Sequence, residues 1–233
     1  MFSQSKKKEN ESNVITPETK SEYNEGYIRG KVESAKYYKS KPRRENHDRL
    51  PPGQQLIGAR FPVLDLGFKP NFDPKKWKLS VHGLVQNPQE FSYEQFLKLP
   101  KAVTTADFHC VTHWSKFDVE WSGVRFVDLL EIVKPLPEAE YVITECADGY
   151  TTNNALDEFL DENVLLAYEL DGLPIPREHG WPVRVIIPHL YAWKGGKFVT
   201  GLCFQAEDEL GFWEERGYHN HADPWKEERY SED

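Results

Sequence analysis

The chain has 233 residues, of which 39% are hydrophobic, and it carries a formal net charge of −9 at pH 7. This length and apolar content are enough for a globular protein with a substantial core. The acidic balance argues against a nucleic-acid-binding surface, which needs a basic face, and favours a small molecule as the partner. No run approaches the roughly 18 apolar residues of a membrane-spanning helix, so no membrane span is predicted.

A cytoplasmic location is predicted from the N-terminus and from the cysteines. The lysines at positions 6–8 are not followed by the apolar core of a secretory signal peptide. The three cysteines, Cys110, Cys146 and Cys203, are an odd and sparse set that does not resemble a disulfide framework. Reduced thiols are therefore expected, and a reduced thiol can serve as a metal ligand.

Composition divides the chain into two parts. Residues 1–45 are rich in Lys, Glu, Ser and Asn, which predicts a polar, partly flexible N-terminal arm. The tyrosines within residues 22–38 are compatible with either a short helix or a partly ordered arm, and no function is assigned there. Residues 46–233 form the predicted folded domain, in which short apolar runs alternate with Pro and Gly.

The first elements of this domain follow from periodicity and capping residues. Residues 77–83 alternate between apolar and polar side chains and end at a glycine, which predicts a half-buried strand. A short helix is predicted over residues 92–99, because Ser92 and Gln95 stand at the positions of a capping box and Pro100 follows. A second helix is predicted over residues 127–133.

The later elements indicate the fold class. Apolar runs predict strands over residues 141–144, 184–187 and 197–204, and residues 156–160 predict a helical turn. Strands and short helices are mixed without the regular βαβ rhythm of a doubly wound sheet. The predicted fold is therefore α+β, with mixed β-sheets, short helices and long functional loops.

The densest chemical cluster places the thiol of Cys110 between the imidazoles of His109 and His113, beside Trp114. Taken alone, it has two interpretations that do not involve catalysis by a cofactor. Cys110 can be a small buried residue while the histidines bind backbone carbonyls. Alternatively, His109, Cys110 and His113 can form a zinc site, although their spacing matches no standard zinc motif.

A second cluster combines cations with glycines and predicts a phosphate site. Arg184 and Lys197 supply a planar guanidinium and a point charge, and Gly195 and Gly196 allow backbone N–H groups to approach an anion. His179 begins the same region. The spacing is not that of a P-loop. The competing interpretation is that Arg184 and Lys197 are solvated strand ends.

Together and in order, these segments resemble the molybdopterin-binding domain of the sulfite oxidase family, especially its small, stand-alone bacterial members. The resemblance covers most of residues 50–230. It is carried by the motifs FHCVTHWS at 108–115, WSGV at 121–124, ADGYT at 147–151, LLAY at 165–168, HGWPVRV at 179–185, PHLYAWK at 188–194, GFW at 211–213 and DPW at 223–225.

The resemblance implies that Cys110 is the one protein ligand of molybdenum, alongside the dithiolene sulfurs of a single pterin. A soft thiolate suits a metal that changes oxidation state, and His109 and His113 are expected to lower the pKa of the thiol. His113 and Trp114 are expected to line the substrate pocket. The residues expected to contact the pterin and its phosphate are Phe61, Asp65, His109, Cys146, His179, Arg184, Gly195, Gly196 and Lys197.

The implied activity is two-electron oxygen-atom transfer on a small substrate, either sulfite-like oxidation or reduction of a sulfoxide or N-oxide. The family's sulfite oxidases surround their anion with arginines, whereas this chain has none between Cys110 and Arg125, which disfavours sulfite. The chain has no haem domain, so a separate electron donor or acceptor is expected. A non-catalytic binding module remains the alternative, since a fold alone does not certify catalysis.

Overall fold

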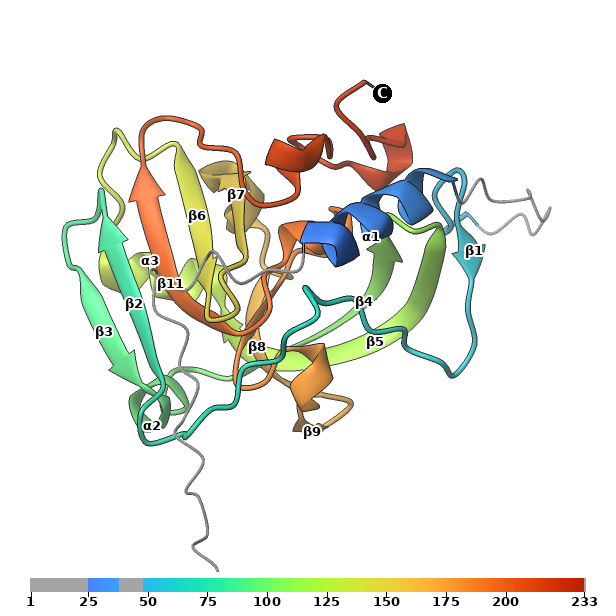
Figure 1. Cartoon of the computed structure of the whole chain (residues 1–233). Helices are drawn as coiled ribbons and strands as arrows, with labels where there is room; N and C mark the ends of the chain where they lie inside the picture. The colour runs from blue at the N-terminus through green and yellow to red at the C-terminus, as the bar shows by residue number, and fades with distance from the viewer. Residues whose placement is uncertain (1–24, 38–47, 233) are drawn as a thin grey trace, which may run out of the picture.

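Two β-sheets form the frame of the protein (Figure 1). The computed structural model describes residues 25–37 and 48–232, so most of the predicted arm lies outside the described residues. One sheet has the order β1-β5-β8-β10, with β4 paired to β5 and β9 paired to β8. Its strands are β1 (Gln55–Leu56), β4 (Ala102–Cys110), β5 (Trp114–Arg125), β8 (Leu165–Leu170), β9 (Leu173–Pro174) and β10 (Arg184–Ile186).

The second sheet has the order β3-β2-β11-β6-β7. Its strands are β2 (Lys78–Gly83), β3 (Gln89–Ser92), β6 (Tyr141–Cys146), β7 (Thr151–Ala155) and β11 (Val199–Gln205). Each sheet combines antiparallel pairs with one parallel pair, β1 with β5 and β2 with β11. The predicted α+β class with mixed sheets is therefore confirmed.

Short helices connect these strands. The α-helices are α1 (Glu25–Tyr37), α2 (Tyr93–Phe96) and α3 (Phe126–Val133). The short 3-10 helices are η2 (Leu156–Leu160), η3 (Arg177–His179), η4 (Ala192–Lys194), η5 (Glu214–Arg216) and η6 (Pro224–Lys226). None of the described helices is long and apolar enough to cross a lipid bilayer.

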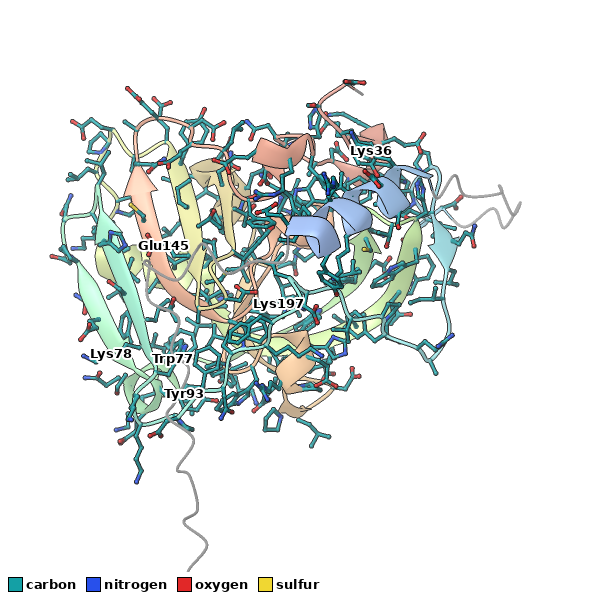
Figure 2. The ribbon with its side chains drawn as sticks, viewed as in Figure 1. Lys36, Trp77, Lys78, Tyr93, Glu145 and Lys197 are labelled. Carbon is teal, nitrogen blue, oxygen red and sulfur yellow. The ribbon has the colours of Figure 1, made fainter. Side chains whose placement is uncertain are left out.

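Local sequence accounts for the start of the five-stranded sheet. Strand β2 buries Leu79 and Val81 on one face, as the alternation over residues 77–83 predicts. Helix α2 begins at the predicted capping box, in which the Gln95 amide donates to Ser92 Oγ and the Ser92 amide donates to Gln95 Oε1. The helix ends at Phe96, before the predicted residue 99. Trp77 packs edge-on against Tyr93 at 5.6 Å between ring centroids, which fixes α2 beside the sheet (Figure 2).

The main hydrophobic core contains side chains from both sheets. Val81 and Leu202 come from the five-stranded sheet, and Val124 and Leu166 come from the six-stranded sheet. All four are fully buried. Burial of this much apolar surface is the dominant favourable contribution to folding, and it holds the two sheets in a fixed relation to each other.

Helix α1 lies within the segment that composition assigns to the polar arm, and it packs onto the domain. Ile28 and Ala35 on its inner face are buried, and Ile28 belongs to the main core. Lys31 forms an ion pair with Asp65, with 3.6 Å between Nζ and Oδ1. Of the two alternatives for residues 22–38, the structure shows the helix over the described part, Glu25–Tyr37.

A buried ion pair joins η4 to η5. Lys194 Nζ lies 2.8 Å from Glu214 Oε1, and both side chains are at most 1% exposed.

Replacing Glu214 with Gln leaves the ammonium group of Lys194 buried without its carboxylate partner. We expect the free energy of unfolding to fall by about 3–5 kcal/mol, measured by urea denaturation of the cofactor-free protein. The exposed pair Lys98–Glu94, 2.6 Å apart, is the control, and Glu94→Gln should leave the free energy of unfolding near the wild-type value. Equal effects of the two substitutions would contradict this expectation.

Candidate functional site

A hairpin between β4 and β5 positions Cys110. Cys110, the last residue of β4, pairs with Trp114, the first residue of β5. Between them the chain turns at His113, which adopts a left-handed conformation with φ 67°. The His113 amide donates to Cys110 O at 3.2 Å, and its ring Nδ1 lies 3.0 Å from Gly53 O. The turn therefore fixes the cysteine backbone and directs the His113 ring toward the Gly53 loop.

The Cys110 side chain is enclosed by aromatic residues and is 3% exposed. It clusters with Tyr191, Trp193 and Tyr218, and its Sγ lies 3.1 Å from Thr112 Oγ1. Burial raises the pKa of the thiol, while the contacts with Thr112 act in the opposite direction. In the protein without a metal, the neutral thiol is therefore favoured, and a bound cation would stabilise the thiolate.

The predicted effect of the two flanking histidines on this thiol is wrong. Burial lowers the pKa of His109 to about 4, and its Nδ1 lies 2.8 Å from Ser115 Oγ. Burial also lowers the pKa of His113. Both imidazoles are neutral at pH 7, so neither supplies a positive charge that would lower the pKa of Cys110.

The zinc alternative is also unsupported by the geometry. Within residues 25–37 and 48–232, no three His, Cys, Asp or Glu side chains converge as a metal site. His109 is bound to Ser115, and His113 is bound to the Gly53 carbonyl. In the described part of the chain, Cys110 therefore lines the cavity without the further ligands that a zinc site needs.

A cavity of about 770 Å³ opens beside Cys110. It joins the two clusters that the sequence analysis singles out, although they lie far apart in the chain. The predicted site residues that line it are Phe61, Asp65, Cys110, Trp114, His179, Arg184, Gly195 and Lys197. The predicted site residues that do not line it are His109, His113, Cys146 and Gly196.

Arg184 lies at the start of β10 and supplies a buried cation to the cavity. It is 4% exposed, and its Nη1 donates to His179 O at 3.0 Å. Its Nε is buried and has no hydrogen-bond partner among the described residues. The guanidinium lies 5.3 Å from the ring centroid of Phe108 and 5.1 Å from that of Trp121. Burial lowers the pKa of Arg184 to about 10, so the charged group lacks the compensation that an anion would give.

Lys197 adds a second cation to the same wall (Figure 2). Its ammonium donates to Leu64 O, and to Glu178 O at 3.1 Å. Burial, followed by repulsion from Arg184, lowers its pKa to about 8. Two neighbouring cations that are bonded to backbone carbonyls rather than to carboxylates make this end of the cavity fit an anion such as a phosphate.

Gly180 brings these cations together. It follows η3 and has φ 116°, a conformation that favours glycine. A Cβ at this position would lie 3.1 Å from the Cβ atoms of both Arg184 and Lys197. The glycine therefore allows the η3 loop, with His179, to lie directly against the two side chains.

Gly195 and Gly196 have packing roles in this structure. A Cβ on Gly196 would lie 2.7 Å from Cys146 Sγ, and one on Gly195 would lie 2.4 Å from Val185 O. The Gly195 amide donates to Ala192 O at 3.3 Å, so it is already bonded within the protein. Cys146 packs against Gly196 and does not line the cavity.

Several residues of the cavity wall are not among the site residues predicted from the sequence. Asp148 and Tyr150 come from the hairpin between β6 and β7, and Trp193, Trp213 and Tyr218 supply aromatic surface. The Tyr150 hydroxyl donates to Trp193 O. Trp213 lies within one of the motifs that carry the family resemblance, but no local pattern shows that it faces Cys110.

Asp148 gives the cavity a pH-dependent carboxyl group. Burial raises its pKa from the ordinary value of 3.8 to about 7, although its Oδ1 accepts the Tyr150 amide at 3.2 Å. Because the folded-state pKa lies above the unfolded value, its contribution to stability is complete below pH 3.8 and is lost as the pH rises to about 7.

Asp148→Asn should remove this dependence. Urea denaturation of the cofactor-free variant should give the wild-type stability at pH 4 and a gain on the order of 2–4 kcal/mol at pH 8. Asp118→Asn is the control, because Asp118 is exposed and bound to Arg49 at 2.7 Å. A constant difference between Asp148→Asn and wild type from pH 4 to pH 8 would contradict the assignment.

The residues present fit an anionic cofactor that carries a soft metal. Arg184 offers an unpartnered buried N–H, and Lys197 offers a second charge at the same wall. Cys110 supplies a sulfur that faces the same cavity. Thiolate sulfur suits a redox-active metal, and a guanidinium suits a phosphate.

Comparisons with known proteins point to the same chemistry. Residues 66–213 match the family model described as the oxidoreductase molybdopterin binding domain. The uncharacterized oxidoreductase YuiH of Bacillus subtilis (strain 168) is 42% identical over 198 residues, covering 84% of this chain and 100% of that protein. The sulfite oxidase of Arabidopsis thaliana is 26% identical over 211 residues, covering 72% of this chain and 53% of that protein.

Two further relatives extend the comparison. The protein-methionine-sulfoxide reductase catalytic subunit MsrP of Campylobacter jejuni is 27% identical, covering 66% of this chain and 59% of that protein. The sulfane dehydrogenase SoxCD from Paracoccus pantotrophus shares the fold, with a TM-score of 0.53 and 22% identity over 64% of this chain and 45% of that one. The chain thus spans the whole Bacillus relative and about half of the others. It belongs to the sulfite oxidase-like family of molybdopterin-binding oxidoreductases, enzymes whose cofactor is molybdenum-molybdopterin.

Proposed function

We propose that the protein catalyses two-electron oxygen-atom transfer on a small substrate, with the Cys110 thiolate as the protein ligand of molybdenum. One observation carries this proposal. The cavity of about 770 Å³ has the Cys110 sulfur and the Arg184 and Lys197 cations on its walls. A metal held by a pterin that ends in a phosphate needs both kinds of partner within a single cavity.

The cation wall would hold the pterin and its phosphate. Arg184 would donate through its unpartnered Nε, and Lys197 would contribute its charge beside it. His179 would contact the pterin rings through the exposed edge of its imidazole. The imidazole already packs against Phe61, with 4.6 Å between the two ring centroids. When bound, the molybdenum cofactor supplies the change of oxidation state that oxygen-atom transfer requires. The chain itself orients the cofactor and excludes water from it.

The surroundings of Cys110 favour a neutral substrate. Cys110 packs with Thr112 and with the aromatic rings of Tyr191, Trp193 and Tyr218, and the cations whose charge acts on its sulfur are Arg229 and Lys197. Arg229 donates to the carbonyls of Val111 and Pro52, and Lys197 is assigned to the cofactor phosphate, so a sulfite dianion would be poorly compensated. We therefore propose reduction of a small sulfoxide or N-oxide as the physiological direction. Methionine sulfoxide reductases are among the relatives.

The electron donor is proposed to be a separate molecule in the cytoplasm. The MsrP relative is named a catalytic subunit, which implies a partner for that protein. All three cysteines of this chain are free, as expected in a reducing compartment. The matches to oxidoreductases leave a non-catalytic binding module without support.

Turnover with defined substrates tests this proposal. Protein from a host that makes the cofactor is assayed with a reduced viologen dye and dimethyl sulfoxide, methionine sulfoxide or trimethylamine N-oxide, and separately with sulfite and an oxidised dye. Substrate-dependent oxidation of the viologen is expected to exceed sulfite oxidation at equal cofactor content. Faster sulfite turnover would reverse the proposed direction, and no turnover in either assay would contradict the activity.

A further inference from the structure

Helix α1 covers the cavity that holds the proposed site. In Figure 1 it crosses the molecule in front of the six-stranded sheet and beside the C-terminal segment. Six of its residues line the cavity, namely Gly26, Tyr27, Gly30, Lys31, Ser34 and Ala35. The helix lies outside residues 66–213, the segment that the family model matches. The cavity therefore has a wall that this matched segment does not contribute.

The packing of α1 joins it to the main core and to the aromatic cluster around Cys110. Ile28 belongs to the main core, and Val32 packs against the aromatic cluster that contains Cys110. Near the end of the helix, Lys36 Nζ lies 5.2 Å from the ring centroid of Tyr230 (Figure 2). Near its beginning, Glu25 pairs with Arg216 at 3.4 Å. Contacts along its length hold the helix over the cavity.

Lys31 links α1 to the cofactor-facing segment 61–67. Its ammonium donates to the backbone carbonyl of Asp65 and pairs with the Asp65 carboxylate at 3.6 Å. From the cavity wall, Lys197 donates to the carbonyl of Leu64. Two lysines from different parts of the chain thus bind adjacent carbonyls of one segment, and both line the cavity.

Gly30 keeps space beneath the helix. Glycine is unfavourable inside a helix because it loses more backbone entropy than other residues. Apart from its neighbours and its own helix backbone, no atom of residues 25–37 and 48–232 lies within 4 Å of the place that a Cβ on Gly30 would occupy. Because Gly30 also lines the cavity, this open space is available to whatever the cavity binds.

We propose that α1 is a cofactor-retaining roof, in which Lys31 holds the segment 61–67 closed and Gly30 leaves room for the bound cofactor. This inference rests on the proposed function, since it requires the molybdenum cofactor in the cavity. Lys31 acts as a positioning residue through Asp65. Release of the cofactor then requires α1 to leave the cavity, so contacts along the helix slow its loss.

The first test measures retention in the full-length holoprotein. Molybdenum and pterin that remain bound are quantified over time during dialysis. Lys31→Met should lose both roughly 3- to 10-fold faster than wild type, because it removes a charge-assisted hydrogen bond and an ion pair. Arg29→Met is the control on the same helix, since Arg29 is exposed and does not line the cavity, and it should behave as wild type. Gly30→Phe should reduce the initial cofactor content by roughly half or more by filling the space, whereas Gly58→Phe, in an exposed loop with equally open surroundings, should not.

The second test measures protection of the helix by the cofactor. Trypsin cleavage after Arg29, which lies on the exposed face of α1, is compared between wild-type protein with and without cofactor. Cleavage should be at least about 5-fold slower in the holoprotein, because a ligand that binds the closed state suppresses local opening. Equal cleavage rates together with wild-type retention in Lys31→Met and Gly30→Phe would overturn the inference while leaving the proposed function intact. A wild-type protein that takes up no molybdenum would overturn both.

Discussion

Cys110→Ser should abolish turnover and leave the purified protein with little or no molybdenum. A serine hydroxyl is nearly isosteric with the thiol, but it is a poor ligand for a soft metal and stays protonated at neutral pH. Outer partners of metal ligands already contribute roughly 10- to 100-fold to metal affinity or activity. Loss of the ligand itself is therefore expected to reduce dye-linked turnover by more than about 100-fold.

The matched control for this experiment is Cys203→Ser. Cys203 lies on β11 and does not line the cavity, so molybdenum content and turnover should remain near wild type. Both variants are analysed for metal by mass spectrometry and for pterin by fluorescence after denaturation. A Cys110→Ser protein with one molybdenum per chain and wild-type turnover would rule out the proposed ligand.

Arg184→Met should have opposite effects on the cofactor-free protein and on cofactor binding. Burial lowers the pKa of Arg184 from 12.5 to about 10, so the charged guanidinium destabilises the empty protein at pH 7. Methionine fills a similar volume without a charge and should raise the unfolding free energy of the empty protein by on the order of 1–3 kcal/mol. The same substitution should weaken cofactor binding by about 30-fold or more, because it removes a buried charge-assisted partner of the phosphate.

Urea denaturation of protein from a host that cannot make the pterin gives the first quantity, and cofactor content at limiting supply gives the second. Arg60→Met is the control, since Arg60 is exposed and does not line the cavity. If Arg184→Met destabilises the empty protein and leaves cofactor content unchanged, Arg184 has a structural role and the proposed phosphate site is wrong.

Local signals in the sequence predict the elements that are marked by alternating side chains, a short apolar run or a capping box. The strand at β2, the capping box of α2 and the strands β6, β10 and β11 are found close to their expected positions. The long hairpin of β4 and β5 is not predicted as strands. Its register shifts between Ala106 and Phe108, and β5 also pairs with β1 and β8, so distant partners determine its extent.

The candidate site is likewise predicted only where its residues are close together in the sequence. The clusters around Cys110 and around Arg184 and Lys197 are visible in the sequence, and the structure brings them to one cavity. The parts of the cavity wall formed by α1 and Trp213 could not be predicted from neighbouring residues, because their contacts join segments that are far apart in the chain. Burial also decides the charge of His109, and burial cannot be inferred from neighbouring residues alone.

The central strand of the five-stranded sheet is the last strand, in chain order, of the described residues. Strand β11 lies between β2 and β6, which precede it by many residues. While the ribosome is still making the polypeptide, the β2–β3 and β6–β7 hairpins have no shared neighbour, and pairing over such separations is slow. Trp213 and Tyr218 are made later still. We therefore expect the cofactor to be delivered only after the chain has been made as far as Tyr218.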